Sequence, residues 1–476
     1  MDKVIGSPDE IVARIPDGAS VAIAGFGLAH RFPSGLMEAL VRSEAKDLTL
    51  VCNSWGRFGQ ALSQLIEDRR VAKLITSFSA RAGEGRSPAE EQIAEGTLAV
   101  ELVPQGTLVE RLRAGGAGLG GFFTPTGVGT AIAEGKEVRE IDGRLHVFEQ
   151  ALRVDYAMVR AHRGDRVGNL ELRGGSRHFN VSFAKAATTA VAEVDEVVEA
   201  GAIDPEHVGL PGVFVAHVVP TTTVVDLDEL VAANKMRRRP SDVPRTYLGR
   251  PGLTRLDMAA RAARLLPDGS YVNLGFGIPS QVCDFVDDRD ITLHTENGIL
   301  GYGPVVTGPD IDPDYYSAGS RFVSLRPGAS FFDSVTSFEM VRGGRLTAVL
   351  LGAYQVDQDG NLANWSTPDM VGGGIGGAMD LAAGDNEVIV LMEHCESRAD
   401  QPKLVRRCTY PLTGLACVDV VVTDLALLRR HPGADRFTLE EVAPGFTTDD
   451  VVALTDMDVA VAEPVRPLVG VGEGVG

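Results

Sequence analysis

The chain has 476 residues, of which 44% are hydrophobic and 23% charged, and this length exceeds one ordinary domain. These proportions are typical of a globular protein, and no apolar run approaches the roughly 18 residues of a membrane helix. The formal net charge of −20 argues against broad nucleic-acid binding, and the N-terminus lacks the apolar segment of a secretory signal. We therefore expect a cytoplasmic protein that binds neither nucleic acid nor membranes.

The residue types that bind metals are scattered along the chain. Five cysteines show no CxxC spacing, and nine histidines form no HExxH or HxH pair. We predict no metal site, and we interpret the cysteines as reduced residues of the core or of strands.

Strand-like runs alternate with amphipathic segments through both halves of the chain. The pattern predicts helices at residues 33–42, 63–67, 87–93, 255–265 and 279–286. Such alternation favours an α/β fold with open, mainly parallel sheets and helices on their faces.

A polar, proline-containing stretch divides the sequence. We predict a first domain over 1–228, a linker over 229–252 and a second domain over 253–476. The run KMRRR at 235–239 is compatible with a docking patch, but a solvated linker is the favoured interpretation.

The two halves contain a weak repeat. VAIAGFG at 21–27 resembles VNLGFG at 272–277, and DRVGNL at 165–170 resembles DQDGNL at 357–362. This predicts two related α/β modules packed face to face, with a site between them and an insertion in the first.

Glycine-rich turns are candidates for ligand contact. The GFG turns at 25–27 and 275–277 fall at strand ends, where open α/β sheets bind ligands, but neither completes a dinucleotide motif. The run GGGIGG at 372–377 is compatible with a flexible loop and also with a backbone cradle for an oxyanion or phosphate, and its residues alone leave both interpretations open.

A single carboxylate, Glu296, lies between the strand-like run 290–294 and glycines at 298, 301 and 303. We therefore expect it where a strand ends and a glycine-rich turn begins, with little side-chain bulk around it. Local pattern alone leaves open whether it is a surface residue of a β-turn or a nucleophile.

The string TENGILGYGP at 295–304 resembles the SENGxxG signature of family I coenzyme A transferases, the 3-oxoacid CoA-transferase group. The resemblance covers nearly the whole chain in matching order, through PQGTLVERLRAGGAGLGGFFTPTGVGT (104–130), NLGFGIP (273–279), LRPGASFFDS (325–334), GNLANW (360–365), GGIGGAMDL (373–381) and CTYPLTGLACVDVVVTD (408–424).

The resemblance implies a CoA-transferase in which Glu296 attacks an acyl-CoA and a glutamyl-CoA thioester follows, with ping-pong kinetics. It implies acyl-CoA and small carboxylic or 3-oxo acids as ligands and CoA as substrate and covalent intermediate, with no permanently bound cofactor. We also expect a homo-oligomer, either a dimer or a tetramer.

Individual site residues follow from the same resemblance. Asn364 and Gly377 match positions that bind the oxyanion or CoA, and Gln105 matches a residue that reaches the site from the other module. The remaining expected CoA contacts are Gly275, Gly277, Asn297, Gly298 and Gly376. Without the resemblance, a strand-end Asn and a helix-entry Gly would be the simpler interpretations of Asn364 and Gly377. For Gln105, local sequence leaves open whether it is a β-turn residue or a site residue.

Three segments depart from the family pattern. Residues 318–321 read AGSR where AGKE is usual, so a lysine is lost, and 25–33 and 77–86 also differ. Transfer chemistry is therefore better supported than succinate and acetoacetate as substrates. The alternatives are an acyl-CoA hydrolase on the same fold and a non-catalytic CoA-binding protein.

Overall fold

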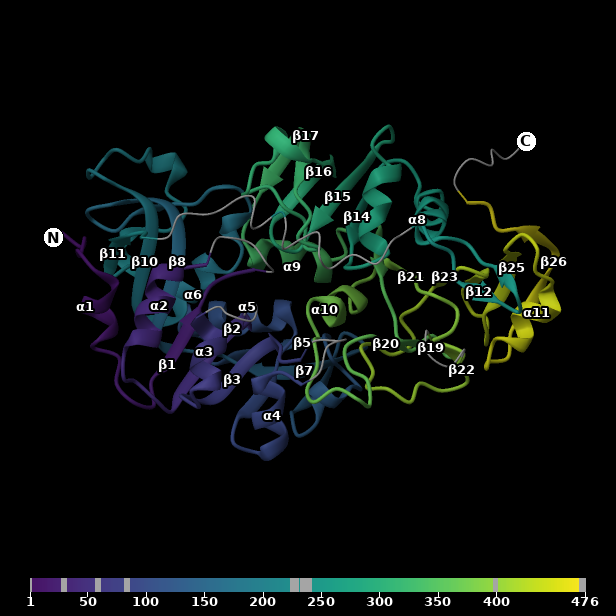
Figure 1. Ribbon diagram of the computed structural model, residues 1–476, viewed down its shortest axis with the longest axis horizontal. Coiled ribbons are helices and arrows are strands. Elements are labelled where there is room, and N and C mark those ends of the chain that lie inside the picture. The colour runs from purple at the N-terminus through teal and green to yellow at the C-terminus, as the bar shows by residue number, and fades with distance from the viewer. Residues whose placement is uncertain are drawn as a thin grey trace.

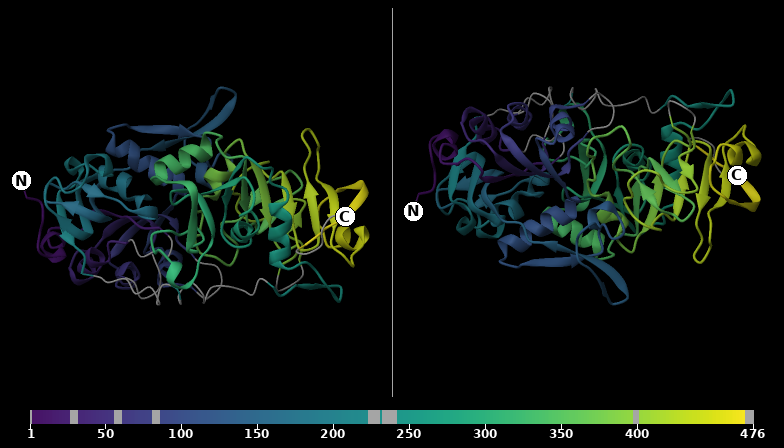
Figure 2. Two further views of the ribbon diagram at one scale, coloured as in Figure 1. Left: turned by 90° about the horizontal axis from the view of Figure 1, so that it is seen from above. Right: turned by 90° about the horizontal axis from the view of Figure 1, so that it is seen from below.

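The computed structural model describes residues 2–26, 32–55, 61–80, 86–222, 231, 242–396 and 401–470. Two large sheets dominate it, one in each half of the chain, and they lie side by side in Figure 1. The first half is coloured purple to blue there and the second teal through green to yellow. The two ends of the chain lie at opposite ends of the molecule (Figure 2).

The first sheet has the order β11-β10-β8-β1-β2-β3-β4, and all of these neighbours are parallel. The short β9 (Leu170–Glu171) pairs antiparallel with β8. The other strands are β1 (Ser20–Ile23), β2 (Leu48–Ser54), β3 (Val71–Phe78), β4 (Ala99–Leu102), β8 (Val154–Asp165), β10 (Ala187–Val198) and β11 (His217–Pro220). The helices of this half are α1 (Pro8–Val12), α2 (Ser34–Arg42), α3 (Ala61–Glu67), α4 (Pro88–Glu95), α5 (Gln105–Gly116) and α6 (Asn180–Ala186).

The second sheet has a parallel centre, β15-β14-β18-β21-β23, and antiparallel pairing adds strands at both edges, except that the outermost strand β26 pairs parallel with β25. The central strands are β14 (Ser270–Leu274), β15 (Ile291–Thr295), β18 (Ala348–Leu351), β21 (Glu387–Leu391) and β23 (Val420–Val422). Runs such as AVLL in β18 are apolar throughout because parallel strands are usually covered on both faces. The edge strands are β16 (Ile299–Val305), β17 (Val323–Phe331), β24 (Ala426–Arg429), β25 (Thr438–Val442) and β26 (Ala460–Pro467).

Three small sheets, four further α-helices and six 3-10 helices complete the described fold. The small sheets comprise β5 (Gly121–Thr124), β6 (Val138–Ile141) and β7 (Arg144–Gln150); β12 (Thr246–Tyr247) and β13 (Arg250–Pro251); and β19 (Gln355–Asp357), β20 (Leu362–Ala363) and β22 (Leu404–Val405). The helices of the second half are α8 (Arg255–Ala263), α9 (Ser334–Arg342), α10 (Ala378–Ala382) and α11 (Thr448–Ala453). Within the described residues, none of the helices has the length and apolar character needed to cross a membrane.

The predicted α/β class, with two related and mainly parallel modules, is confirmed. The repeat extends to hydrogen bonding, because Asp165 accepts from the backbone N–H and side-chain amide of Asn169 as Asp357 does from those of Asn361. Each Asp carboxylate therefore closes an equivalent turn in its own module.

The predicted helix at 279–286 is instead a 3-10 helix, η5 (Pro279–Phe285). An α-helix would require the carbonyl of Ser280 to accept a hydrogen bond from the backbone N–H four residues later. That carbonyl accepts a hydrogen bond of 2.7 Å from the guanidinium of Arg321. The side-chain contact thus competes with regular α-helical pairing.

Candidate active site

Glu296 lies in the turn between β15 and β16, as its sequence context predicts. The hairpin brings β16 back antiparallel, and the positive φ of Gly298 (107°) completes the turn. A Cβ at Gly298 would lie 2.0 Å from the carbonyl oxygen of Phe332, so only glycine fits here. The Glu296 side chain is buried, and this burial raises the pKa of its carboxyl group.

The carboxylate of Glu296 is held from the neighbouring strand β14. The amide nitrogen Nδ2 of Asn273 donates to Oε2 of Glu296 at 3.3 Å and also lies 3.0 Å from Nδ1 of His294. Nε2 of His294 lies 3.0 Å from Oγ of Ser337 in the first turns of α9. Because Asn273 donates to Nδ1, the ring proton is assigned to Nε2, which donates to Ser337.

His294 is fully buried, and desolvation lowers its pKa to about 3. Its neutral ring therefore keeps an acceptor directed at Asn273 throughout the ordinary pH range. The ring is also stacked on Phe332 at a centroid distance of 6.0 Å. His294 thus fixes the amide that contacts Glu296 without adding a charge beside it.

Asn297 supports the turn through its own side chain. It accepts a hydrogen bond of 2.5 Å from the hydroxyl of Thr295 and donates one of 2.8 Å to the carbonyl of Tyr316. A Cβ on Gly175, in the first half, would come within 3.2 Å of Nδ2 of Asn297. The turn that carries Glu296 therefore lies against the other module.

Three other predicted residues lie near the carboxyl ends of β14 and β18, although Asn364 itself follows β20 of a small sheet. Gly275 follows β14, and its N–H donates to the carbonyl of Leu350 in β18 at 2.8 Å. The side chain of Asn364 donates to the carbonyl of Gly352, directly after β18, at 3.1 Å. Gly277 has a φ of 89°, and a Cβ there would meet none of the described atoms within 4 Å. These residues share the sheet edge at which open α/β folds bind ligands.

Gln105, Gly376 and Gly377 meet across the two halves of the chain. The backbone N–H of Gln105 donates to the carbonyl of Gly376 at 2.9 Å, and a Cβ at Gly377 would lie 3.0 Å from Oε1 of Gln105. Nε2 of Gln105 donates to Oδ1 of Asn53 at 2.9 Å, whereas its buried Oε1 has no hydrogen-bond partner among the described residues. An unpartnered buried acceptor is costly, which makes this amide a candidate ligand contact.

The glycine run at 372–377 pairs with the end of β3 instead of leaving all its amides open. The N–H of Gly376 donates to the carbonyl of Ser77, and that of Gly373 donates to Oγ of Ser79. A Cβ at Gly374 would lie 2.8 Å from the Phe78 ring. The run is therefore glycine-rich because a strand of the first half approaches it closely, and these two amides form no phosphate cradle.

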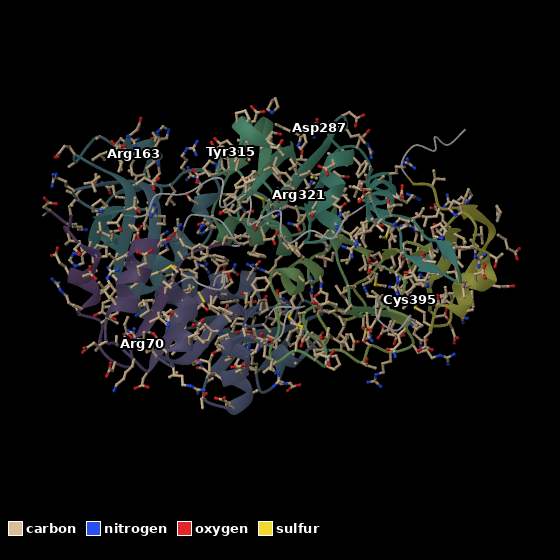
Figure 3. All side chains as sticks on the ribbon, in the orientation of Figure 1. Arg70, Arg163, Asp287, Tyr315, Arg321 and Cys395 are labelled. Atoms are coloured by element: carbon tan, nitrogen blue, oxygen red, sulfur yellow. The ribbon has the colours of Figure 1, made fainter. Side chains whose placement is uncertain are left out.

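Arg321, which stands beside the lost lysine position, is directed at η5. Its guanidinium donates to the carbonyl of Ser280 at 2.7 Å and to the carboxylate of Asp284 at 2.9 Å. Figure 3 shows Arg321 and Tyr315 in the part of the second half that contains β15 to β17, whereas Cys395 lies toward the C-terminal strands. The charge of Arg321 is thus already paired.

The structure adds three residues that sequence analysis did not select: Asn53, Asn273 and His294. Asn273 opens the NLGFGIP segment, and His294 precedes TENG, but the contacts of both depend on the pairing of β14 with β15. Parts of the departing segments 25–33 and 77–86, namely 27–31 and 81–85, and the basic run 235–239 lie outside the described residues.

Known proteins resemble this chain in amino-acid sequence and in fold. A family model described as Coenzyme A transferase matches residues 5–221 and 255–454. The chain is 38% identical over 486 aligned positions to human succinyl-CoA:3-ketoacid coenzyme A transferase 2, mitochondrial, and this alignment covers 98% of this chain and 91% of that protein. It is 44% identical over 219 residues to one of the subunits of 3-oxoadipate CoA-transferase from Pseudomonas putida, covering 46% of this chain and 94% of that one.

The fold is also shared with a solved structure. An acyl-CoA transferase from E. coli O157:H7, solved as a thioester complex with CoA, superposes with a TM-score of 0.78 at 20% identity. The superposition covers 98% of this chain and 95% of that one, so both halves of the fold match together.

Proposed function

Because the chain belongs to the coenzyme A transferase family and is a CoA-transferase, we propose that it transfers CoA through a covalent thioester on Glu296. The carboxylate of Glu296 attacks the thioester carbonyl of an acyl-CoA, forming a mixed anhydride and releasing CoA thiolate. The thiolate then attacks the glutamyl carbonyl, giving a glutamyl-CoA thioester and the free acid. An acceptor carboxylate reverses these steps, so the kinetics are ping-pong.

One observation carries this proposal: the carboxyl group of Glu296 is buried at the end of β15, where the two halves meet, and this burial raises its pKa. Desolvation makes the Glu296 carboxylate a stronger nucleophile than an exposed one, while the amide of Asn273 favours its ionised form. Burial also restricts the access of water, which would otherwise hydrolyse an anhydride or thioester.

We assign Gly377 to the oxyanion or CoA subsite and Gln105 to the CoA subsite, because Oε1 of Gln105 lies 3.0 Å from the point where a Cβ of Gly377 would stand and is an open acceptor for an N–H or O–H group of CoA. We assign Asn364 to the oxyanion or CoA subsite as well, where its hydrogen bond to the carbonyl of Gly352 fixes the position of its side chain. Gly275 and Gly277 allow CoA to approach the strand edge. Asn297, Gly298 and Gly376, expected as CoA contacts, also support the site from within the protein. Asn297 does so through the two hydrogen bonds of its side chain, Gly298 through its close packing against Phe332, and Gly376 through its backbone hydrogen bonds.

The ligands we propose are an acyl-CoA and a small carboxylic or 3-oxo acid, the classes named for the relatives. The finer prediction is that succinyl-CoA with acetoacetate is not the best pair. It is supported by the pairing of Arg321 with Asp284, which leaves this arginine poorly placed to replace the lost lysine.

We retain three further expectations as proposals. The domains divide as 1–228 and 253–476 around the linker 229–252, and the protein is a dimer or tetramer. A cytoplasmic location is the third, although the human relative is named mitochondrial. Light scattering on the purified chain tests the oligomeric state.

Substitution of Glu296 tests the proposed function. Glu296→Ala should abolish transfer with the fold intact, and Glu296→Asp should lower kcat by about 100-fold because the nucleophile is withdrawn by about 1 Å. The assay should follow acyl transfer to an acceptor and, separately, CoA release without one. Near-normal turnover in the Ala variant would remove Glu296 from the mechanism, and rapid CoA release without an acceptor would identify a hydrolase.

A further inference from the structure

A single buried carboxylate, Asp380, joins the two halves beside Gln105 and Gly377. It lies in α10, three residues after Gly377, and is fully buried. Its Oδ2 accepts a hydrogen bond of 2.8 Å from the backbone N–H of Gly106, the residue that follows Gln105 in α5. The second half thus holds the first turn of a helix from the first half.

The other oxygen of Asp380 has two partners on different elements. Oδ1 accepts a hydrogen bond of 3.1 Å from the hydroxyl of Thr126, after β5, and lies 3.3 Å from Nη1 of Arg342 at the end of α9. The two oxygens together therefore contact α5, the segment after β5, and α9. In Figure 1, α5, α9 and α10 gather where the two halves meet.

We propose that Asp380 is a positioning residue that sets the side-chain amide of Gln105 against Gly377. This inference rests on the proposed role of Gln105 in the active site. The backbone of Gln105 is fixed on one side by the carbonyl of Gly376 and on the other, through Gly106, by Asp380. Because α10 and the loop before it hold two consecutive backbone N–H groups, they fix the backbone position from which the Gln105 side chain extends, and Asn53 then binds the side-chain amide.

The packing at Gly106 shows how little room the contact has. A Cβ at Gly106 would lie 2.5 Å from Oδ1 of Asp380 and 2.6 Å from Nη1 of Arg342. Any side chain there would displace the carboxylate or the guanidinium. Glycine is thus required by the approach of Asp380, although alanine would favour the helix itself.

Two variants perturb this contact in independent ways. Asp380→Asn keeps the shape of the side chain but removes its charge toward Arg342, and Gly106→Ala keeps the charge but forces the contact apart. Each should lower kcat by about 10- to 100-fold with a smaller change in KM for acyl-CoA, because misplacement of a catalytic contact by about 1 Å has effects of this size.

Matched controls separate this effect from general loss of stability. Glu441→Gln removes another buried carboxylate, which pairs with Arg261 at 2.7 Å within the second half. Gly120→Ala adds a Cβ that meets no atom of the described residues within 4 Å. Both controls should retain kcat.

A double-mutant cycle with Gln105→Ala provides the decisive readout. If Asp380 acts through Gln105, adding Asp380→Asn or Gly106→Ala to Gln105→Ala should lower kcat by less than about threefold further. An equal loss of kcat in both backgrounds, or wild-type kcat in both single variants, would overturn the proposal. Where Asp380→Asn does not fold, Gly106→Ala decides the question alone. Failure of the Glu296 mechanism is distinguished by an active Glu296→Ala enzyme.

Discussion

Asn273 donates a hydrogen bond of 3.3 Å to Glu296, and the same amide nitrogen lies 3.0 Å from Nδ1 of His294. The imidazole therefore orients the amide that contacts the carboxylate. Because Asn273 and His294 pair in register on β14 and β15, the sheet itself fixes the distance between donor and carboxylate.

Loss of this donor should move the pH dependence of transfer. The hydrogen bond from Asn273 lowers the pKa of Glu296 against the larger raising effect of burial. In Asn273→Leu the pKa of Glu296 should rise, so the acid limb of kcat/KM should shift to higher pH. Asn386→Leu is the control. Asn386 and Asn273 are both buried, and among the described residues the Oδ1 atom of each has no hydrogen-bond partner. An unshifted limb in Asn273→Leu would show that the contact does not govern ionisation of Glu296.

The buried carboxyl group of Glu296 should lower the stability of the folded protein at neutral pH. Burial raises the pKa of Glu296 above its ordinary value of 4.5, so folding favours the protonated form. This contribution to stability is present below about pH 4.5 and is lost as pH rises through the folded-state pKa. Glu296→Gln should therefore raise Tm at pH 8 relative to wild type, and the gain should shrink toward pH 4.5. A variant that is less stable than wild type at pH 8 would contradict this account.

His294 should contribute to acid denaturation. Its folded-state pKa is lowered from 6.5 to about 3, so its stabilising effect is fully present above pH 6.5 and is lost as pH falls toward 3. In His294→Gln, the fall in Tm between pH 6.5 and 4 should be shallower. An unchanged slope would indicate that other groups, such as buried His394, dominate this range.

Substrate preference should depend on position 320 and not on Arg321. Ser320→Lys should restore a charge-assisted contact and raise the relative kcat/KM for succinyl-CoA by about 10- to 150-fold, the range of about 1.5 to 3 kcal/mol. Arg321→Ala should leave the order of substrates unchanged, because its guanidinium is bound to Asp284 and Ser280. A panel of acyl-CoA donors and acceptor acids provides the comparison. If wild type already prefers succinyl-CoA and acetoacetate, the interpretation of the lost lysine is wrong.

Local patterns predicted the two modules and the turn at Glu296 well. In both cases the information lies within short segments: alternating strand-like and amphipathic runs, and a β-branched run followed by glycines. The repeated segments 165–170 and 357–362, noted only as similar sequences, also form equivalent turns. These features do not require knowledge of the rest of the fold.

Long-range contacts were not predictable in this way. The amide of Gly373 bonds Ser79 across a separation of 294 residues, so the glycine run resembled a ligand cradle until its partner strand was known. The carbonyl of Ser280 in η5 likewise accepts a hydrogen bond from Arg321, 41 residues away, which the local pattern at 279–286 does not contain. The sequence did not single out Asn273, because its contacts with Glu296 and His294 arise only when β14 pairs with β15.

Trapping the covalent intermediate tests the central claim most directly. Wild-type enzyme should be mixed with acyl-CoA in the absence of an acceptor, treated with borohydride and digested for mass spectrometry. We predict inactivation together with reduction of the thioester at the peptide that contains Glu296, and no such change in Glu296→Ala. Modification of another carboxylate, or acyl transfer at full rate without any trapped adduct, would contradict the mechanism.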